Sequence, residues 1–375
     1  MSTSRTARSP LFEWWRTVDH LTLALFVCLL GTGLILSMAA SPAAAERLSV
    51  ANPFYHLYKH SVFVILGFSG AIILSFFSAQ NARRIGILAL IGSFFLLLMV
   101  KFAGYEVKGA QRWISLGFFG LQPSELAKPS FIVFAAWMFS VGKRDPAVPA
   151  VPLVFIVYLA LIFFLIQQPD FGQSFLLTLC FAAVFFFAGL SLGSVLFLMI
   201  GTGGAAFMAY LFMPHVQSRI QRFMSPAGED NYQTERALEA IRSGGFFGRG
   251  PGEGDVKFSL PDGHTDFIFA VTVEEFGFLI SAFVIILLAG FVIRCFRNAL
   301  KLNDYFSQLA VAGLATMIGM QTLINLFVNL NMAPPKGMTL PFISYGGSSM
   351  LALCFSAGLI LAFTRRRPGA YGYGD

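Results

Sequence analysis

The stretch DFIFAVTVEEFGFLISAFVIILLAGFVI, residues 266–293, decides the fold of this chain. It is an apolar run long enough to cross a hydrocarbon core of about 30 Å as a helix. Asp266 heads this run, and it follows a long polar segment that ends in LPDGHTDF. A carboxylate at the mouth of a membrane helix, preceded by a large polar loop, indicates chemistry at a membrane surface.

The composition of the whole chain agrees with that stretch. Of its 375 residues, 56% are hydrophobic, 12% are charged and 43 are Phe. A single soluble core could not bury so much apolar surface. Strands of a membrane barrel would alternate apolar and polar residues, whereas these runs do not. The sequence therefore predicts an all-α integral membrane protein, a polytopic bundle of about ten transmembrane helices.

The predicted spans lie near residues 21–40, 60–78, 85–103, 124–141, 150–167, 171–189, 191–213, 266–293, 306–329 and 342–364. An even number of spans places both termini on one side of the membrane. The basic residues of the short connections fall on that side, which the positive-inside rule makes cytoplasmic. We expect one membrane domain over residues 1–375, with cytoplasmic tails at 1–20 and 365–375 and a large extracytoplasmic loop at 214–265.

Several other classes of protein are excluded. The cysteines show no paired ligand spacing, so neither a disulfide framework nor a zinc site is expected. The net charge of +7 is spread as topology markers rather than gathered on one face, which argues against a nucleic-acid partner. The segment GGFFGRGPGEG, residues 244–254, looks like a phosphate loop, but it matches neither standard pattern and no strand precedes it. No nucleotide energy source is visible.

Polar residues gather in clusters on the predicted outer side. In GAQRWISLGFFGLQPSELAK, residues 109–128, Glu125 and Lys128 have the i,i+3 spacing of a helical pair and are predicted to neutralise each other inside the membrane. Arg112 and Trp113 have two interpretations. Trp113 suits an interfacial aromatic belt, and Arg112 could grip an anionic headgroup.

Two further clusters are assigned structural roles. In QPDFGQS, residues 168–174, Pro169 breaks the chain between two spans and Asp170 is predicted to cap the next helix through its backbone N–H groups. The segment NYQTERALEAIRSGGFFGRGPGEG, residues 231–254, predicts a short amphipathic surface helix that is closed by glycines.

The cluster LPDGHTDFIFAVTVEEFGF, residues 260–278, contains His264, Asp266, Glu274 and Glu275. In a regular helix Glu274 lies about 12 Å below Asp266 and Glu275 points to nearly the opposite face, so no compact triad forms. One or both of the glutamates are assigned to bundle packing or partner pairing. Asp266 is either a catalytic carboxylate within reach of water or a structural one, a helix N-cap or first-turn carboxylate.

The cluster PPKGMTLPFISYGGSS, residues 334–349, breaks the helix with prolines and permits tight turns through its glycines. Broken backbone at membrane depth normally lines a cavity. Lys336 either binds a pyrophosphate there or snorkels to the membrane boundary. The serines are expected to satisfy local backbone, because no histidine base accompanies them in sequence.

Taken together and in this order, the motifs GAQRWISLGFFGLQPSELAK, QPDFGQS, LPDGHTDFIFAVTVEEFGF and PPKGMTLPFISYGGSS resemble the SEDS family (shape, elongation, division and sporulation). The resemblance covers nearly the whole chain, and the last motif is more similar to the division branch than to the elongation branch. It implies a peptidoglycan glycosyltransferase that polymerises lipid II on the outer face of the bacterial cytoplasmic (inner) membrane, at the division septum.

The resemblance also assigns residues. The Asp of the family's HTDF motif is the catalytic carboxylate, and it maps onto Asp266. Three places depart from the family's pattern: Pro335 stands where Thr is common, PDGH at residues 261–264 stands where PEAH or PEGH is frequent, and Phe258 stands where an acidic residue is sometimes found. No regulatory carboxylate is therefore expected at position 258. The substrate-binding residues expected on these grounds are Arg112, Trp113, Lys336 and His264.

The expected reaction is attack of a GlcNAc 4-hydroxyl on the MurNAc anomeric carbon while undecaprenyl pyrophosphate departs, with inversion at that carbon. Asp266, with an unperturbed pKa of about 3.9, would be ionised at neutral pH and act as the general base. Lys336, Arg112 or a divalent cation such as Mg²⁺ or Mn²⁺ would stabilise the departing pyrophosphate. An apolar furrow between helices would hold the lipid tail.

The resemblance implies a class B penicillin-binding protein, the septal transpeptidase, as a partner, together with other membrane proteins of the division complex. Two alternatives come from other classes. One is a transporter that flips lipid II along the intramembrane charges, and the other is a non-catalytic division scaffold. The transporter is disfavoured because no inverted repeat is evident and the polar clusters lie outside the midplane.

Overall fold

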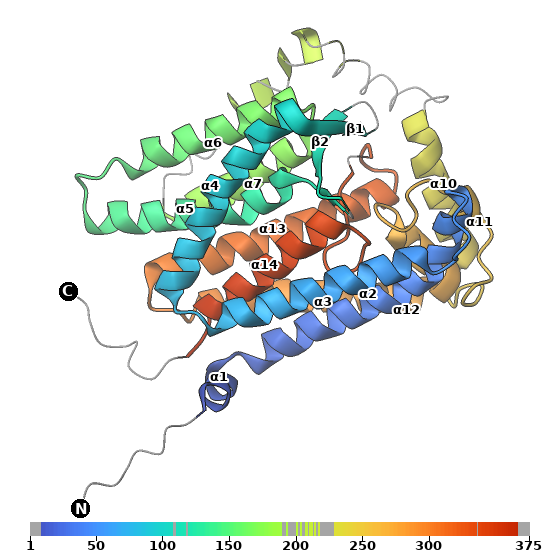
Figure 1. The fold of residues 1–375 in the computed structure, drawn as a ribbon, viewed down its shortest axis with the longest axis horizontal. Coiled ribbons are helices and arrows are strands. Elements are labelled where there is room, and N and C mark those ends of the chain that lie inside the picture. Colours follow the sequence, from blue (N-terminus) through green and yellow to red (C-terminus); the bar gives the residue numbers. More distant parts are fainter. Residues whose placement is uncertain are drawn as a thin grey trace, which may run out of the picture.

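The computed structural model describes residues 9–107, 110–117, 119–189, 229–335 and 337–366, together with isolated positions between 193 and 217. Most of this part of the chain is helical (Figure 1). The helices are α1 (Pro10–Thr17), α2 (His20–Arg47), α3 (Tyr55–Phe76), α4 (Ala79–Ala103), α5 (Pro123–Arg144), α6 (Ala150–Gln167), α7 (Phe171–Phe187), α10 (Glu229–Gly244), α11 (Val256–Ser259), α12 (Ile268–Ala299), α13 (Tyr305–Asn329) and α14 (Gly347–Phe363).

Most of the predicted membrane spans coincide with these helices. Within the described residues, α2, α3, α4, α6, α12 and α13 are long and apolar enough to cross a membrane. The helices α7 and α14 are also apolar but have 17 residues each, and α5 has 22 residues with charged side chains in its first turns. The predicted span at 191–213 lies largely outside the described residues. The chain is a multi-pass membrane protein.

The helices form a bundle with α13 at its centre. In α13, 67% of the most apolar stretch is buried, against 28–44% in the other five long spans. α13 packs against α5, α7, α12 and α14, while α3 pairs with α14 and α4 with α5. In Figure 1, α13 and α14 run through the middle of the bundle, with α2, α3 and α12 on one side and α4 to α7 on the other.

The bundle has two ends of different character. The end that carries α1, the start of α2 and the end of α14 is called the terminal end below. The opposite end carries α10, α11 and the non-helical residues 331–335 and 337–346, together called segment 331–346, and it is called the loop end (Figure 1). Asp266, at the start of α12, lies at the loop end.

A small antiparallel sheet also lies at the loop end, between α4 and α5. Its strands are β1 (Gly104–Val107), β2 (Ala110–Ser115) and β3 (Gly120–Leu121), in the order β1-β2-β3. Tyr105 of β1 lies opposite Trp113 of β2. The sequence pattern does not predict this sheet, because strands of two to six residues leave little alternation to detect. The sheet places Arg112 and Trp113 on its middle strand.

The predicted amphipathic helix in the large loop is confirmed as α10. It packs against α12, and its small side chains Ala237 and Ala240 are completely buried. The helix is therefore part of the bundle's packed surface at the loop end. It ends at Gly244, where the glycine-rich segment 244–254 begins.

The glycine-rich segment 244–254 forms hydrogen bonds across a break in α12. At Gly277 the φ and ψ angles are 77° and −178°, so the regular helix is interrupted there. A Cβ atom on Gly277 would lie 2.4 Å from the backbone nitrogen of Gly248, so glycine is required. The bonds across the break run from Arg249 N to Glu274 O (2.9 Å), Gly250 N to Glu275 O (3.0 Å), Phe278 N to Gly245 O (3.1 Å) and Leu279 N to Phe246 O (3.4 Å). Segment 244–254 therefore bonds to main-chain groups of α12 that lose their helical partners at the break. These bonds, rather than contacts to a phosphate, occupy its backbone.

Candidate active site

Asp266 lies immediately before the first turn of α12. The cap residue of this helix is Phe267, and no side-chain capping bond forms from it within the described chain. Asp266 is partly exposed, and a Cβ atom built on Gly337 would lie 3.9 Å from its Oδ2 atom. The carboxylate therefore lies beside the broken segment 331–346. Asp266 is therefore not the cap residue of α12, and its catalytic role stays a prediction.

Two asparagines on α13 hold the main chain at Asp266. The Asn325 side-chain amide donates to the carbonyl oxygens of Asp266 (2.8 Å) and Met338 (2.7 Å). The Asn329 amide also donates to Asp266 O (3.0 Å), and its Oδ1 atom accepts from the backbone N–H of Ala270 (3.1 Å). Both asparagines are buried. They satisfy carbonyl groups of non-helical backbone in the interior of the bundle, where an unpaired polar group is costly.

The segment 331–346 is held by further polar side chains. Gln321, one turn before Asn325 on α13, donates to Thr339 O (3.1 Å). The Thr339 hydroxyl bonds to the Ser349 hydroxyl (2.7 Å), and the Ser344 hydroxyl accepts from Leu340 N (2.8 Å). The predicted role of Ser344 in satisfying local backbone is confirmed.

His264 belongs to an aromatic cluster beside Asp266. Its ring centroid lies 4.5 Å from that of His56 and 5.6 Å from that of Tyr345, with which it stacks. Its carbonyl oxygen accepts from Tyr345 N (3.1 Å). The ring nitrogens of His56 and His60 on α3 are buried and have no hydrogen-bond partner within the described chain. The cluster joins the start of α3 to both non-helical segments that flank the site.

Arg112 is bonded to the turn between α6 and α7. Its guanidinium donates to Gln168 O (2.9 Å) and to Pro169 O, and it lies 3.5 Å from the Asp170 carboxylate. Burial raises the pKa of the Asp170 carboxyl, and the charge of Arg112 opposes that rise. Asp170 caps α7 by accepting from Gln173 N (3.4 Å), so its predicted capping role is confirmed. A substrate role for Arg112 and for its strand neighbour Trp113 stays a prediction.

The predicted pairing of Glu125 with Lys128 is confirmed inside α5. The Lys128 ammonium lies 2.9 Å from the Glu125 carboxylate, and both side chains are buried. Gln173 of α7 completes the network, since its Oε1 atom accepts from Lys128 (2.6 Å) and its Nε2 atom donates to Glu125 (2.6 Å). The two charged groups are paired with each other and hydrogen-bonded to Gln173, which lowers the free-energy cost of placing them in the membrane.

Glu274 and Glu275 hold the segment that leads to the site, and both are completely buried. The Glu274 carboxylate accepts from Val256 N (2.7 Å) and Lys257 N (2.9 Å). The Lys257 ammonium forms an ion pair with Glu275 and donates to Gly252 O (3.3 Å). The predicted partner pairing of the glutamates is thereby confirmed. The carboxylates of the two adjacent glutamates thus bind residues 256 and 257, and their carbonyl oxygens accept from the backbone N–H groups of Arg249 and Gly250.

Two of the expected ligand-binding groups cannot be located in the structure. Lys336 lies outside the described residues, although its neighbour Gly337 lies beside Asp266. Among the described residues, no three His, Cys, Asp or Glu side chains gather as a metal site. The residues that would hold a divalent cation are therefore not identified, and no chemical step below depends on one.

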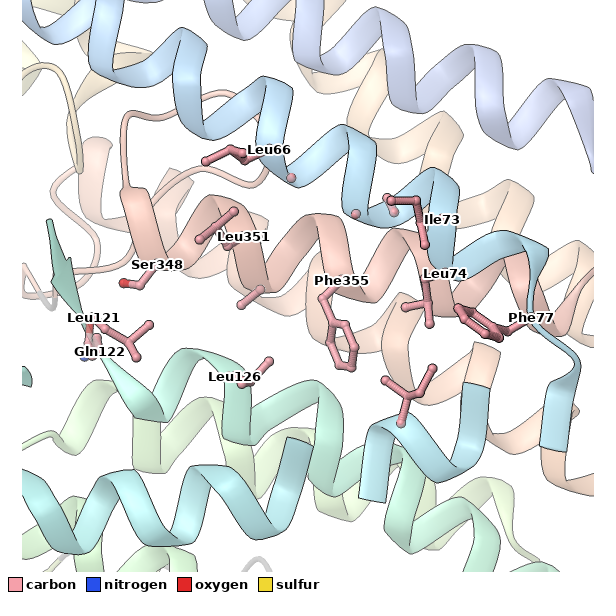
Figure 2. Close-up of a pocket in the computed structure, with 15 residues that line it drawn as sticks. Leu66, Ile73, Leu74, Phe77, Leu121, Gln122, Leu126, Ser348, Leu351 and Phe355 are labelled. Carbon is pink, nitrogen blue, oxygen red and sulfur yellow. The ribbon is translucent and has the colours of Figure 1, made fainter. Parts of the chain in front are cut away.

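An apolar groove runs along the bundle from the loop end toward the terminal end. It lies among α3, α5 and α14, with Ile85 of α4 at its far end, and has a volume of about 440 Å³. Figure 2 shows Gln122 and Ser348 near one end of the groove and Phe77 near the other, with Leu351 and Phe355 between them. The end near Ser348 adjoins segment 331–346. An extended apolar chain fits such a groove, with its polar end toward the site.

Sequence reasoning missed the amides of α13. Gln321, Asn325 and Asn329 recur at i, i+4 and i+8 in an otherwise apolar span, so they lie on one helix face. Polar residues inside a membrane span mark partners in the protein interior. That spacing is the signal that could have identified these residues as contacts of the two broken segments.

Comparison with known proteins gives a family. The family model described as cell cycle protein, of the FtsW, RodA and SpoVE type, matches residues 19–368. A protein of Caulobacter vibrioides (strain NA1000 / CB15N) named "Probable peptidoglycan glycosyltransferase FtsW" is 44% identical over 373 residues, which cover 98% of this chain and 95% of that protein. A protein of the same name from Saccharophagus degradans is 35% identical over 372 residues, covering 94% of each.

Solved structures have the same fold. The Thermus thermophilus rod shape determining protein RodA matches with a TM-score of 0.70 and 28% identity, covering 93% of this chain and 97% of that one. A chain from a structure described as "Structural coordination of polymerization and crosslinking by a peptidoglycan synthase complex" matches with a TM-score of 0.76 and 27% identity, covering 92% and 97%.

The fold and the site together define a class: a polytopic membrane protein with a partly exposed carboxylate at one end and an apolar groove that begins at the same end. Within that class, the matches extend over almost the entire length of the chain. The chain belongs to the FtsW/RodA/SpoVE family, the SEDS family.

Proposed function

We propose that this chain is a peptidoglycan glycosyltransferase that polymerises lipid II during septal cell-wall synthesis, with Asp266 as its general base. The observation that carries the proposal is the position of Asp266. Its carboxylate is partly exposed outside the first turn of α12 and lies beside segment 331–346. The names of the relatives at 44% and 35% identity support the same reaction.

The proposed chemistry is one inverting substitution. Asp266 takes the proton of the GlcNAc 4-hydroxyl as that oxygen bonds to the anomeric carbon of the MurNAc donor. The bond from this carbon to the pyrophosphate oxygen breaks, and its electron pair leaves with undecaprenyl pyrophosphate. Lys336, one residue before Gly337, is proposed to bind the pyrophosphate, and His264 to line the sugar site. The products are a β-linked glycan, the free lipid pyrophosphate and a proton on Asp266.

The groove of α3, α5 and α14 is proposed to hold the lipid tail of a substrate. Its polar residues Gln122 and Ser348 lie near segment 331–346, and its remaining lining is almost entirely apolar. Binding the tail there would present the sugar and pyrophosphate at the loop end, where Asp266 lies. A sugar polymerase would thus be embedded in the bilayer because its substrate is anchored there.

Orientation and partners are proposed on separate grounds. The positive-inside rule places the terminal end in the cytoplasm and the loop end outside. The solved chain with a TM-score of 0.76 comes from a peptidoglycan synthase complex whose description is the structural coordination of polymerization and crosslinking. We therefore expect a class B penicillin-binding protein as partner at the division septum, together with other membrane proteins of the division complex.

The test is glycan-strand formation from fluorescent lipid II by the purified chain with its cognate transpeptidase, which has no transglycosylase of its own. Wild type is expected to produce polymer and Asp266→Asn none. Asp255→Asn is the matched control, because its exposed carboxylate forms a surface ion pair with Arg249, which contributes little to stability. Equal polymer from wild type and Asp266→Asn would remove Asp266 from the reaction, and no polymer from folded wild type would favour a flippase or a scaffold.

A further inference from the structure

We propose that Asn325 is a positioning residue that fixes Asp266 relative to Met338 of segment 331–346. The inference rests on the proposed function and extends it to a residue on α13. Asn325 touches neither the substrate nor the reacting atoms in this scheme. It acts by joining the main chain on the two sides of the site.

The geometry of one side-chain amide carries the inference. The NH₂ group of Asn325 has two N–H bonds, and both are used: one donates to Asp266 O (2.8 Å) and the other to Met338 O (2.7 Å). The two N–H directions are fixed in one plane, so neither carbonyl can shift without breaking a bond. Asn325 is 1% exposed, so water cannot replace either bond. Its amide therefore sets the distance between Asp266 and a residue two positions after Lys336.

The neighbouring amide keeps Asn325 in place. Asn329 donates from Nδ2 to Asn325 Oδ1 (3.2 Å), which leaves the Asn325 amide one orientation. Asn329 also accepts from Ala270 N (3.1 Å), an N–H in the first turn of α12. Because no capping bond from Phe267 forms within the described chain, Asn329 caps α12 from another helix. Both amides donate to Asp266 O, but their other contacts differ: Asn329 bonds to the start of α12, and Asn325 bonds to Met338 and so joins Asp266 to segment 331–346.

A purely structural role for Asn325 predicts a different outcome. If the amide only satisfied buried carbonyls, its loss would lower the unfolding temperature, and the folded fraction would keep its turnover. If it positions Asp266, turnover falls in fully folded protein, because a catalytic group displaced by about 1 Å loses on the order of 100-fold in rate. Substrate affinity would change little, since the lipid groove does not include Asn325.

The experiment compares Asn325→Leu, Asn325→Gln and the control Thr322→Val in the full chain with its cognate transpeptidase. Fluorescent lipid II gives kcat and KM at a temperature well below every unfolding midpoint. Thr322 is a fitting control because it is buried on α13 and its hydroxyl bonds only to Ile318 O of its own helix among the described contacts (2.8 Å). Asn325→Gln keeps both donors but moves them outward by one methylene.

For Asn325→Leu we expect kcat to fall about 100-fold while KM stays within about threefold of wild type. For Asn325→Gln we expect the unfolding midpoint to recover and kcat to remain low, and for Thr322→Val we expect wild-type kinetics. If Asn325→Leu does not fold, the kcat of Asn325→Gln decides the question. Wild-type kcat in folded Asn325→Leu or Asn325→Gln overturns the positioning role.

Results that contradict the proposed function can be told apart from results that contradict the positioning role of Asn325. If the proposed function is wrong, wild type makes no polymer, or Asp266→Asn makes as much as wild type, whatever the asparagine variants do. A loss in Asn325→Leu that appears in KM rather than kcat also overturns the proposal, because it would make Asn325 a substrate-binding residue.

Discussion

The two ends of the bundle are held together in different ways. At the loop end the backbone leaves the helical form in the sheet β1–β3, in residues 245–255 and 260–267 on either side of α11, and in segment 331–346, and buried amides and carboxylates satisfy it. At the terminal end the helices run to ordinary caps, and side chains tie them together, some of them partly exposed, such as Asp19 and Arg294, and others buried, such as Trp14 and Ser75. These ties are Asp19 to Arg294 and Asn298, Arg365 to Thr17 and to the main chain of Ser75 and Phe76, and Trp14 to Ser75.

The difference follows from access to water. Non-helical backbone at membrane depth needs a partner from the protein, because an unsatisfied group there costs several kcal/mol. A side chain near the aqueous boundary can exchange a lost partner for water. Changes to the buried groups of the loop end should therefore have large effects on stability or turnover, and a change to the partly exposed pair Asp19–Arg294 at the terminal end should have a small one.

The largest effect is expected from Lys257→Met at the loop end. This change leaves Glu275 completely buried without its cation, and breaking a buried pair from one side costs about 3–5 kcal/mol in the free energy of unfolding. Chemical unfolding in detergent micelles measures that loss. The double variant Lys257→Met/Glu275→Leu is the control and should recover most of it. If the single variant is as stable as wild type, the buried charges do not hold the loop end together.

The next largest effect is expected from Gly277→Ala in α12. The backbone at this glycine occupies a region that costs other residues about 1–3 kcal/mol, and the new Cβ would lie 2.4 Å from the carbonyl carbon of Phe247. Gly290→Ala is the matched control in the same helix, because its nearest neighbour is 4.0 Å away. It should be neutral or slightly stabilising. Equal unfolding midpoints for the two variants would contradict the role of segment 244–254 in completing α12.

The third prediction concerns the groove that runs between the two ends. Gly70 of α3 lines it, and a Cβ at this position meets nothing within 4 Å. Gly70→Leu should therefore fill part of the groove without straining the bundle. We expect KM for lipid II to rise about tenfold, equivalent to about 1.4 kcal/mol, with little change in kcat. Gly92→Leu on α4, which has equally open space but does not line the groove, should leave KM unchanged.

Much of the fold could be predicted from the sequence, because apolar runs of span length require helices in a membrane. The pairing of Glu125 with Lys128 was also accessible, since its partners are three residues apart. The partner of Glu275 was not, because Lys257 lies 18 residues away, beyond a glycine-rich segment whose path no periodicity describes. The same reason hid the contacts of Asn325, which joins two non-helical segments.

In the candidate site, the sequence singled out Asp266 and left its cap role open. Only the structure shows that Phe267, not Asp266, occupies the cap position. Arg112 was considered for headgroup binding from its place in the motif, and its bonds to the α6–α7 turn depend on how the sheet packs. Spacing within one helix can be read from sequence, whereas contacts between broken segments depend on the assembled bundle.

The smallest effect is expected at the terminal end, from Asp19→Asn. Asn keeps the cap on α2 but removes the charge that binds Arg294. Because the pair is partly exposed, the free energy of unfolding should fall by about 1 kcal/mol at neutral pH. Burial alone would raise the pKa of Asp19, but hydrogen bonds from Arg294, Thr22 and Asn298 outweigh it and hold the pKa below its usual 3.8.

A carboxyl with a lowered pKa in the folded state stabilises the protein above its unfolded pKa, and that contribution is lost as the pH falls toward the folded value. The difference in unfolding free energy between wild type and Asp19→Asn should therefore be constant above about pH 5 and shrink below about pH 4. Unfolding midpoints measured across this range test the sign. A difference that persists unchanged into acid would mean that packing, rather than charge, joins α2 to α12 at this end.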